Sequence, residues 1–159
     1  MGVNHDIKVE PVEPGHLDAL LELCREHAAY EEAEFAEDGQ VERWRSAFFA
    51  EPPALHGWVA TDNGTPCGFM TVTNDFATWS ARRFAYLDCL YLQEPYRRMG
   101  LGRAFLERLR EFARDQGCEW AEWQTPPGNE LGIGFYRRMG AVGKPKLRFH
   151  YGIDERGAS

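Results

Sequence analysis

The chain has 159 residues, 43% hydrophobic and 27% charged, and this composition favours one soluble globular domain with a single core. No apolar run approaches the ~18 residues that a membrane-spanning helix needs, so no membrane partner is expected. The formal net charge of −7 argues against nucleic acid as the main partner. The N-terminal segment MGVNHDIKVE lacks the apolar core of a signal peptide, and we expect a cytoplasmic protein.

Charge is distributed unevenly along the chain. Residues 1–79 carry 4 Lys and Arg against 15 Asp and Glu, whereas residues 80–159 carry 14 against 10. This division favours an anion held by the second half and a cation drawn to the first. A chance distribution of solvated charge is the other interpretation.

Hydrophobic periodicity and turn residues predict the elements in chain order. The first half is expected to contain a strand at 7–12, a helix from Pro14, a helix at 41–49 and strands at 58–61 and 68–75. The second half is expected to contain a strand at 85–92, a helix ending at Gln116, a strand at 120–124, a helix from Asn129 to Met139 and a strand at 146–151. This order predicts a mixed α/β sheet with helices on its faces.

Three local signals punctuate these elements. Asn63-Gly64 indicates a hairpin turn, and Gly117 is placed to end a helix. A strongly acidic stretch, YEEAEFAED at 30–38, follows the first helix.

The four cysteines, Cys24, Cys67, Cys89 and Cys118, form no CxxC pair, and the five histidines are scattered singly. We therefore expect reduced thiols and no metal site.

The segment YRRMGLG at 96–102 stands where a strand becomes a helix. A helix N-terminus has unpaired N–H groups and a partial positive charge, glycines let the backbone approach a bound group, and arginines add full charge. The combination predicts an anion cradle suited to phosphates. A tight turn without a ligand explains the two glycines equally well.

Two common phosphate motifs are excluded at this position. A dinucleotide-binding fingerprint would need a third glycine at Phe105. A P-loop would end in Gly-Lys-Ser/Thr, but Gly102 is followed by Arg103-Ala104.

Residues 56–142 resemble the GNAT N-acetyltransferase superfamily in several motifs together. Arg97-x-x-Gly100-x-Gly102 resembles its acetyl-CoA pyrophosphate loop, and LYL at 90–92 matches the preceding strand. Asn129, followed by the aromatic pair Phe135-Tyr136, resembles its second motif. The resemblance implies the GNAT fold, a single α/β domain with a mixed, mostly antiparallel central sheet flanked by helices. It also implies acetyl-CoA as co-substrate, no metal, and a homodimer.

The same resemblance implies which residues hold acetyl-CoA. The expected set is Leu90, Tyr91, Leu92, Arg97, Arg98, Met99, Gly100, Leu101, Gly102, Arg103, Asn129, Phe135 and Tyr136. Backbone N–H groups of 90–92 are expected to hold the thioester carbonyl and the pantetheine arm. Gly132 and Gly134 lie inside the helix after Asn129, where each costs roughly 1 kcal/mol against Ala; they either permit close approach to CoA or only weaken this helix.

Acetyl transfer needs a neutral amine, and a lysine-like ammonium has a pKa near ~10.4, so its proton must be removed before the nitrogen attacks the thioester. By the resemblance, Asp88 is the candidate that removes this proton, directly or through water. Tyr136 is the candidate general acid for the departing CoA thiolate. A solvent-facing strand carboxylate and a packed aromatic are the respective alternatives.

A narrower resemblance is to the spermidine/spermine N-acetyltransferase branch. TWS at 78–80, YLDCLY at 86–91 and the acidic run from Tyr30 carry it, and this branch has an acidic pair where this chain has Asp88-Cys89. The residues implied to bind the acceptor amine are Tyr30, Glu31, Glu32, Trp79 and Asp88. Carboxylates attract a cation and an indole face can hold one, although an acidic run is also a common solvated surface.

The sequence therefore predicts an acetyl-CoA-dependent N-acetyltransferase that acetylates the primary amine of a small cationic acceptor, polyamine or lysine-like, by direct attack in a ternary complex. Acetylation of a protein N-terminus or lysine is one alternative. A non-catalytic acetyl-CoA-binding module, which would need neither Asp88 nor Tyr136, is another.

Overall fold

The structure is a computed structural model that describes residues 4–154. The chain divides into two compact units between Pro126 and Pro127, and the first unit contains the sheet. No helix within 4–154 is long and apolar enough to cross a membrane.

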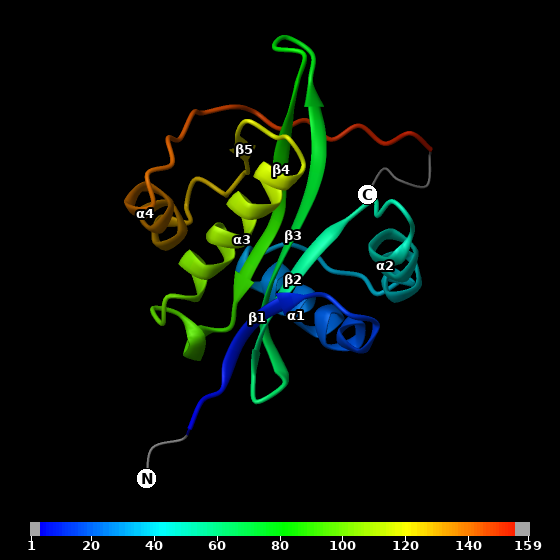
Figure 1. Cartoon of the computed structure of the whole chain (residues 1–159), viewed down its shortest axis with the longest axis vertical. Coiled ribbons are helices and arrows are strands. Elements are labelled where there is room, and N and C mark those ends of the chain that lie inside the picture. The colour runs from blue at the N-terminus through cyan, green and yellow to red at the C-terminus, as the bar shows by residue number, and fades with distance from the viewer. Residues whose placement is uncertain (1–3, 155–159) are drawn as a thin grey trace. The chain divides into compact units, whose positions relative to one another are not determined.

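Five strands form one sheet in the first unit (Figure 1). They lie in the order in which they occur along the chain: β1 (Ile7–Pro11), β2 (His56–Asp62), β3 (Thr65–Ala77), β4 (Arg82–Leu92) and β5 (Ala121–Glu122). The first three pairings are antiparallel, and β4 pairs with β5 in parallel. The prediction of a mixed, mostly antiparallel sheet is confirmed.

Helices cover both faces of this sheet (Figure 1). The helices of the first unit are α1 (Leu17–Tyr30), α2 (Gln40–Phe49) and α3 (Leu101–Asp115), with short 3-10 turns η1 (Pro14–His16) and η2 (Glu94–Tyr96). Leucines of α1 and Phe48 of α2 pack with Val59, Phe69 and Tyr91 in one core cluster. Neighbouring residues of a strand point to opposite faces, and Trp58 accordingly contacts Phe112 of α3.

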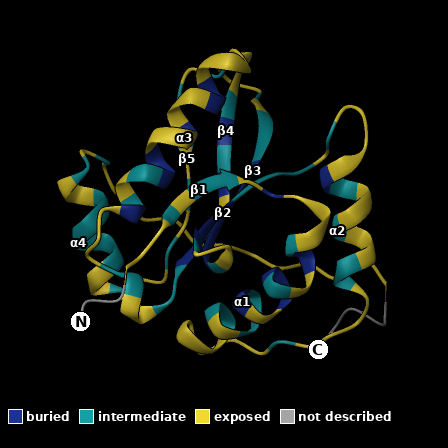
Figure 2. Cartoon of the chain, turned by 60° about the horizontal axis from the view of Figure 1, so that its bottom comes forward, coloured by how far each residue is buried: buried dark blue, intermediate teal, exposed yellow. Residues whose placement is uncertain are grey.

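The amphipathic pattern of each helix explains this arrangement. In α3 the buried residues recur at helical spacing: Leu101, Phe105, Leu106, Leu109, Phe112 and Ala113. Figure 2 shows the buried residues on the central strands and in stripes along the helices. Phe105 is fully buried, so α3, which begins at Leu101 within the segment YRRMGLG, is held firmly against the sheet.

Turn chemistry behaves as the sequence indicates. Asn63 and Gly64 both have positive φ, 49° and 82°, and join β2 to β3 in a tight hairpin. Gly117 has φ of 68° directly after α3, and its N–H donates to the carbonyl oxygen of Arg114 at 3.1 Å. Strand β3 extends to Ala77 and β4 begins at Arg82, so both strands are longer than expected and form a long hairpin.

The second unit contains α4 (Glu130–Arg138), which is capped by Asn129, whose Oδ1 accepts from the N–H of Gly132 at 3.2 Å. A Cβ at Gly132 would lie 3.0 Å from Cγ of Asn129, so this glycine makes room for the cap. The strand expected at 146–151 is wrong: these residues have no regular structure, and Leu147, Phe149 and Tyr151 are 84–88% exposed. Alternating apolar residues form a strand only beside another strand, and none pairs with this segment in the described chain.

Candidate active site

Asp88, the predicted base, is the extra residue of a β-bulge in β4. Thr71 pairs with Cys89 and Val72 pairs with Leu87, so Asp88 has no partner on β3. A bulge bends its strand and redirects a side chain, and the side chain of Asp88 is exposed. The bulge lies near α1, since Cys24 of that helix and Cys89, the neighbour of Asp88, pack against the same core cluster. Burial first, and then the charge of Asp88, raise the pKa of Cys24 to about 12.

The loop after η2 has the backbone geometry of an anion-binding turn. Arg98 and Gly100 both have positive φ, 62° and 82°, and Gly100 is the N-cap of α3. This N-cap residue makes no side-chain capping hydrogen bond, and the first turn of the helix contains no acidic residue. The first N–H groups of α3 and its partial positive charge are therefore not neutralised by an acidic side chain in the first turn of the helix.

Arg97 has contacts that the sequence did not predict. Its Nε donates to the carbonyl oxygen of Leu92 at 2.9 Å, and its guanidinium carbon lies 4.8 Å from the ring centroid of Tyr30 and 5.8 Å from that of Tyr91. The side chain thus joins the start of the loop to β4 and to the end of α1. Arg98 and Arg103 are exposed and supply the charge on the solvent side.

A second group of α1 residues surrounds Tyr91. Its hydroxyl donates to Glu26 at 3.3 Å, and Gln93 Nε2 donates to the same carboxylate at 3.1 Å. Burial first, and then the charge of Glu26, raise the pKa of Tyr91. His27 stacks on the Tyr91 ring at 5.3 Å. Glu26, four residues before Tyr30, was missed by sequence reasoning, and this helical spacing to Tyr30 is the signal that could have found it.

Two carboxylates of the acidic run at 30–38 have partners on α1. Glu31 Oε1 lies 3.1 Å from Nε2 of His27, and Glu37 Oε2 lies 2.9 Å from Arg25. Tyr30 is 43% exposed, and Glu32 is exposed with φ of 55°. The structure therefore brings Tyr30 and Glu31 close to Arg97 and Tyr91, on the α1 side of β4.

Trp79 lies elsewhere in the first unit. It occupies the turn of the β3–β4 hairpin and is fully exposed. Tyr91 is nine residues along β4 from Arg82, roughly 30 Å at the rise of a strand. The structure thus does not bring Trp79 together with Tyr30 within one chain.

The second predicted motif belongs to the second unit. Asn129 caps α4, and the rings of Phe135 and Tyr136 lie 5.5 Å apart on that helix. A proton-donor role for Tyr136 stays a prediction. The arginines that end this helix, Arg137 and Arg138, stand in the turn where positive charge is favourable.

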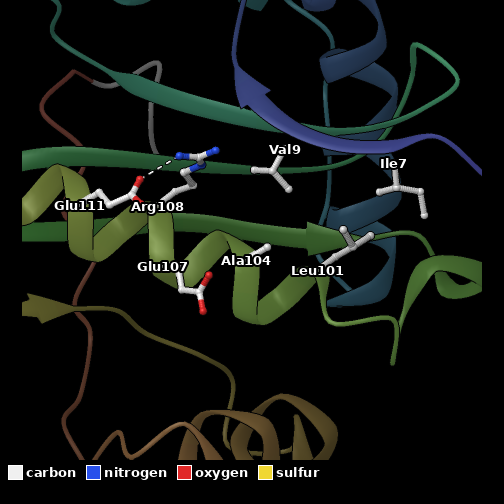
Figure 3. Close-up of a pocket in the computed structure, with 7 residues that line it drawn as sticks. All are labelled: Ile7, Val9, Leu101, Ala104, Glu107, Arg108 and Glu111. Atoms are coloured by element: carbon white, nitrogen blue, oxygen red, sulfur yellow. Dashed lines mark hydrogen bonds and ion pairs between the residues drawn. The ribbon is translucent and has the colours of Figure 1, made fainter.

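A groove of about 340 Å³ lies between β1 and α3 (Figure 3). Ile7, Val9, Leu101 and Ala104 form its apolar part, and Glu107, Arg108 and Glu111 its polar rim. Arg108 donates to Glu111 at 2.9 Å across one turn of α3. Of the predicted cofactor residues only Leu101 lines this groove, so cavity volume does not identify the predicted site. Among the described residues no cluster of His, Cys, Asp or Glu could hold a metal ion.

Comparison with known proteins adds independent information. A profile described as the acetyltransferase (GNAT) family matches residues 17–141. The chain is 28% identical over 141 residues to a thialysine N-epsilon-acetyltransferase of Caenorhabditis elegans, covering 89% of this chain and 86% of that protein. It is 27% identical over 143 residues to the protein of the same name from Bos taurus, covering 85% and 84%.

The fold is also similar to solved structures. An aminoglycoside N-acetyltransferase in complex with CoA superposes with a TM-score of 0.79 at 13% identity, covering 97% of this chain and 99% of that one. At this identity the likeness concerns the fold alone, and it agrees with the α/β architecture derived above.

Proposed function

The chain belongs to the GNAT family and is an acetyl-CoA-dependent N-acetyltransferase, and we propose that it acetylates the primary amine of a small cationic molecule. Two observations support this acceptor. Relatives that cover most of its length include two thialysine acetyltransferases, and thialysine is a lysine-like amine. The acidic run that begins at Tyr30 follows α1, and the last residue of this helix lies against Tyr91 of β4.

The bare N-terminus of α3 is the observation that carries the cofactor assignment. Left-handed Arg98 and Gly100 turn the chain into this helix, and a Cβ on Gly100 would meet nothing within 4 Å, so the space beside it is open. These features fit a pyrophosphate group, which N–H groups at a helix N-terminus bind well. Acetyl-CoA, when bound, supplies the thioester; the loop from Arg97 to Arg103 would hold its pyrophosphate and the backbone of Leu90–Leu92 its pantetheine arm.

Asp88 would remove the proton of the acceptor ammonium, directly or through water, and the neutral amine would then attack in a ternary complex. The bulge supports this role because it turns an exposed carboxylate out of the regular pairing of β4. Asp88→Asn should lower kcat/KM most at low pH, where less of the free amine is neutral. An unchanged pH profile in this variant would remove Asp88 from the mechanism.

Tyr136 would donate a proton to the departing CoA thiolate, with Asn129 and Phe135 as further contacts of CoA. The support is the spacing of Asn129 and Tyr136 on a helix that Asn129 caps. Tyr30, Glu31 and Glu32 would attract the distal cation of the acceptor. Trp79 stays a predicted contact of the acceptor, but it lies at a hairpin turn, so an acceptor that touches it would have to extend beyond the α1 region.

A thiol-release assay with acetyl-CoA and a panel of acceptors tests the function. We expect turnover with lysine-like amines and diamines, and much less with peptides carrying a free N-terminus or a lysine. A preference for peptides would favour the second candidate, protein acetylation, for which the exposure of Tyr30 and Trp79 is the favouring observation. CoA binding without turnover on any amine would leave a non-catalytic binding module.

We also propose a cytoplasmic homodimer. The exposed apolar side chains of 147–153 and the edge strand β1 offer surfaces that a second copy would cover. Light scattering at micromolar concentration should give twice the chain mass, and a monomer at that concentration would refute the dimer.

A further inference from the structure

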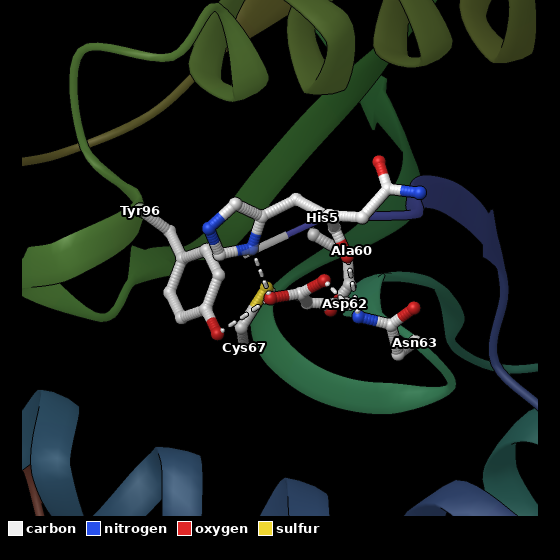
Figure 4. Close-up of polar contacts among 7 residues, drawn as sticks. His5, Ala60, Asp62, Asn63, Cys67 and Tyr96 are labelled. Atoms are coloured by element: carbon white, nitrogen blue, oxygen red, sulfur yellow. Dashed lines mark hydrogen bonds and ion pairs between the residues drawn. The ribbon is translucent and has the colours of Figure 1, made fainter. Parts of the chain in front are cut away.

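Asp62, the last residue of β2, has a side chain of which only 9% is exposed. Its Oδ2 accepts from the Tyr96 hydroxyl at 3.0 Å and lies 2.6 Å from Nδ1 of His5, and its Oδ1 accepts from Asn63 Nδ2 at 3.0 Å (Figure 4). A carboxylate is buried without large penalty only when it has such partners. These contacts, His5 first, hold the pKa of Asp62 below its ordinary value.

These hydrogen bonds join three segments that are distant in sequence. His5 belongs to the segment before β1, Asn63 to the β2–β3 turn, and Tyr96 to η2. The backbone supports the same junction, because the N–H of Asn63 donates to the carbonyl oxygen of Asp6 at 3.0 Å. Figure 4 shows the side chains of His5 and Tyr96 converging on Asp62.

The position of Tyr96 gives this junction its functional meaning. Tyr96 ends η2, and the loop that begins at Arg97 follows at once. The start of η2 is fixed by the N–H of Gln93, which donates to the carbonyl oxygen of Cys67 at 3.0 Å. The hydrogen bond from Tyr96 to Asp62 fixes its end, and it raises the pKa of Tyr96, so the hydroxyl remains a donor.

We propose that Asp62, acting through Tyr96, is a positioning residue that fixes the entry of the acetyl-CoA pyrophosphate loop relative to the sheet. The inference rests on the proposed function, because it requires that this loop binds the pyrophosphate. A hydrogen bond to a carboxylate is stronger than one between neutral groups, so an ionised Asp62 holds the turn more firmly than an amide would. Asp62 itself touches neither substrate.

Two partial analogues of acetyl-CoA, one an acetyl donor and one an inhibitor, separate this role from a general loss of structure. S-acetylpantetheine has the thioester but no pyrophosphate, whereas 3′-phosphoadenosine 5′-diphosphate has the pyrophosphate but no thioester. Tyr96→Phe and Asp62→Asn should raise the KM for acetyl-CoA and the inhibition constant of the nucleotide about tenfold, the scale of one charge-assisted hydrogen bond. Both variants should leave kcat, the KM for the amine and kcat/KM with S-acetylpantetheine within about twofold.

Asp75→Asn is the matched control, because Asp75 also accepts from a hydroxyl, that of Thr73 at 2.9 Å, on a distant part of β3. Asp75→Asn should change the kinetic constants of neither acetyl-CoA nor S-acetylpantetheine. Equal losses with both donors, or an unchanged KM for acetyl-CoA in Tyr96→Phe, would overturn the inference. Gly100→Glu distinguishes failure of this inference from failure of the loop assignment. If Gly100→Glu abolishes inhibition by the nucleotide while Tyr96→Phe does not weaken that inhibition, only the role of Asp62 and Tyr96 is wrong. If Gly100→Glu also leaves the inhibition intact, the assignment of the loop to the pyrophosphate is wrong as well.

Discussion

Gly100 is the position where backbone conformation and ligand binding are most directly linked. Its φ is 82°, in the left-handed region, and an added Cβ would meet nothing within 4 Å. A side chain here therefore causes strain rather than a collision, and the strain is about 1–2 kcal/mol for an L-residue. Gly100→Ala should lower the free energy of unfolding by about this amount, and Gly100→Asn by less, because Asn adopts this conformation more readily.

If the loop relaxes instead, its N–H groups move and the loss appears in affinity, as an increase of about 5- to 30-fold in the Kd for acetyl-CoA. Denaturant unfolding and calorimetry on each variant measure the two effects. Gly15→Ala is the matched control, since its Cβ would also meet nothing within 4 Å and its φ is not positive. Wild-type stability and affinity in Gly100→Ala would refute a constrained anion-binding turn at this residue.

Three further outcomes follow from other parts of the chain. Tyr136→Phe should greatly lower kcat with little change in acetyl-CoA affinity, and near-normal turnover across the pH range would make Tyr136 a packing residue. Burial lowers the pKa of His56, so on acidification this residue is protonated at a higher pH in the unfolded chain than in the folded one. The free energy of unfolding should therefore fall as pH drops below about 6.5. In denaturant titrations His56→Gln should flatten this pH dependence, and an unchanged slope would contradict it. Burial raises the pKa of Cys67 to about 11, so a thiol reagent at neutral pH should label the more exposed Cys118 first, as mass spectrometry of the labelled peptides would show; earlier labelling of Cys67 would contradict this order.

Features encoded over a few residues could be predicted from the sequence. Asn63-Gly64 specifies its turn because both residues tolerate positive φ, and Asn129 caps α4 because its side chain reaches an N–H three residues on. The amphipathic period of 101–115 gave α3 in nearly its observed bounds. The strand, loop and helix order around Gly100 followed from such local signals.

Features that depend on distant partners could not be predicted. The bulge at Asp88 exists only relative to the register of β3, and the contact between Arg97 and Tyr30 joins residues 67 positions apart. Residues 146–151 carry a strand pattern, yet a pattern does not supply the neighbouring strand that pairing requires. Asp62 showed no motif at all, because its partners come from three separate segments.

The acceptor assignment is tested most directly by two amines that differ only in charge at the far end, diaminopentane and aminopentanol. We predict a kcat/KM about fivefold or more higher for the diamine at low salt, after correction for its two equivalent amines, because each exposed carboxylate contributes up to about 1 kcal/mol to a cation. This preference should shrink as salt shortens the Debye length from ~10 Å at ~0.1 M to ~3 Å at ~1 M. A ratio near one at low salt would contradict a cationic acceptor held at the acidic end of α1.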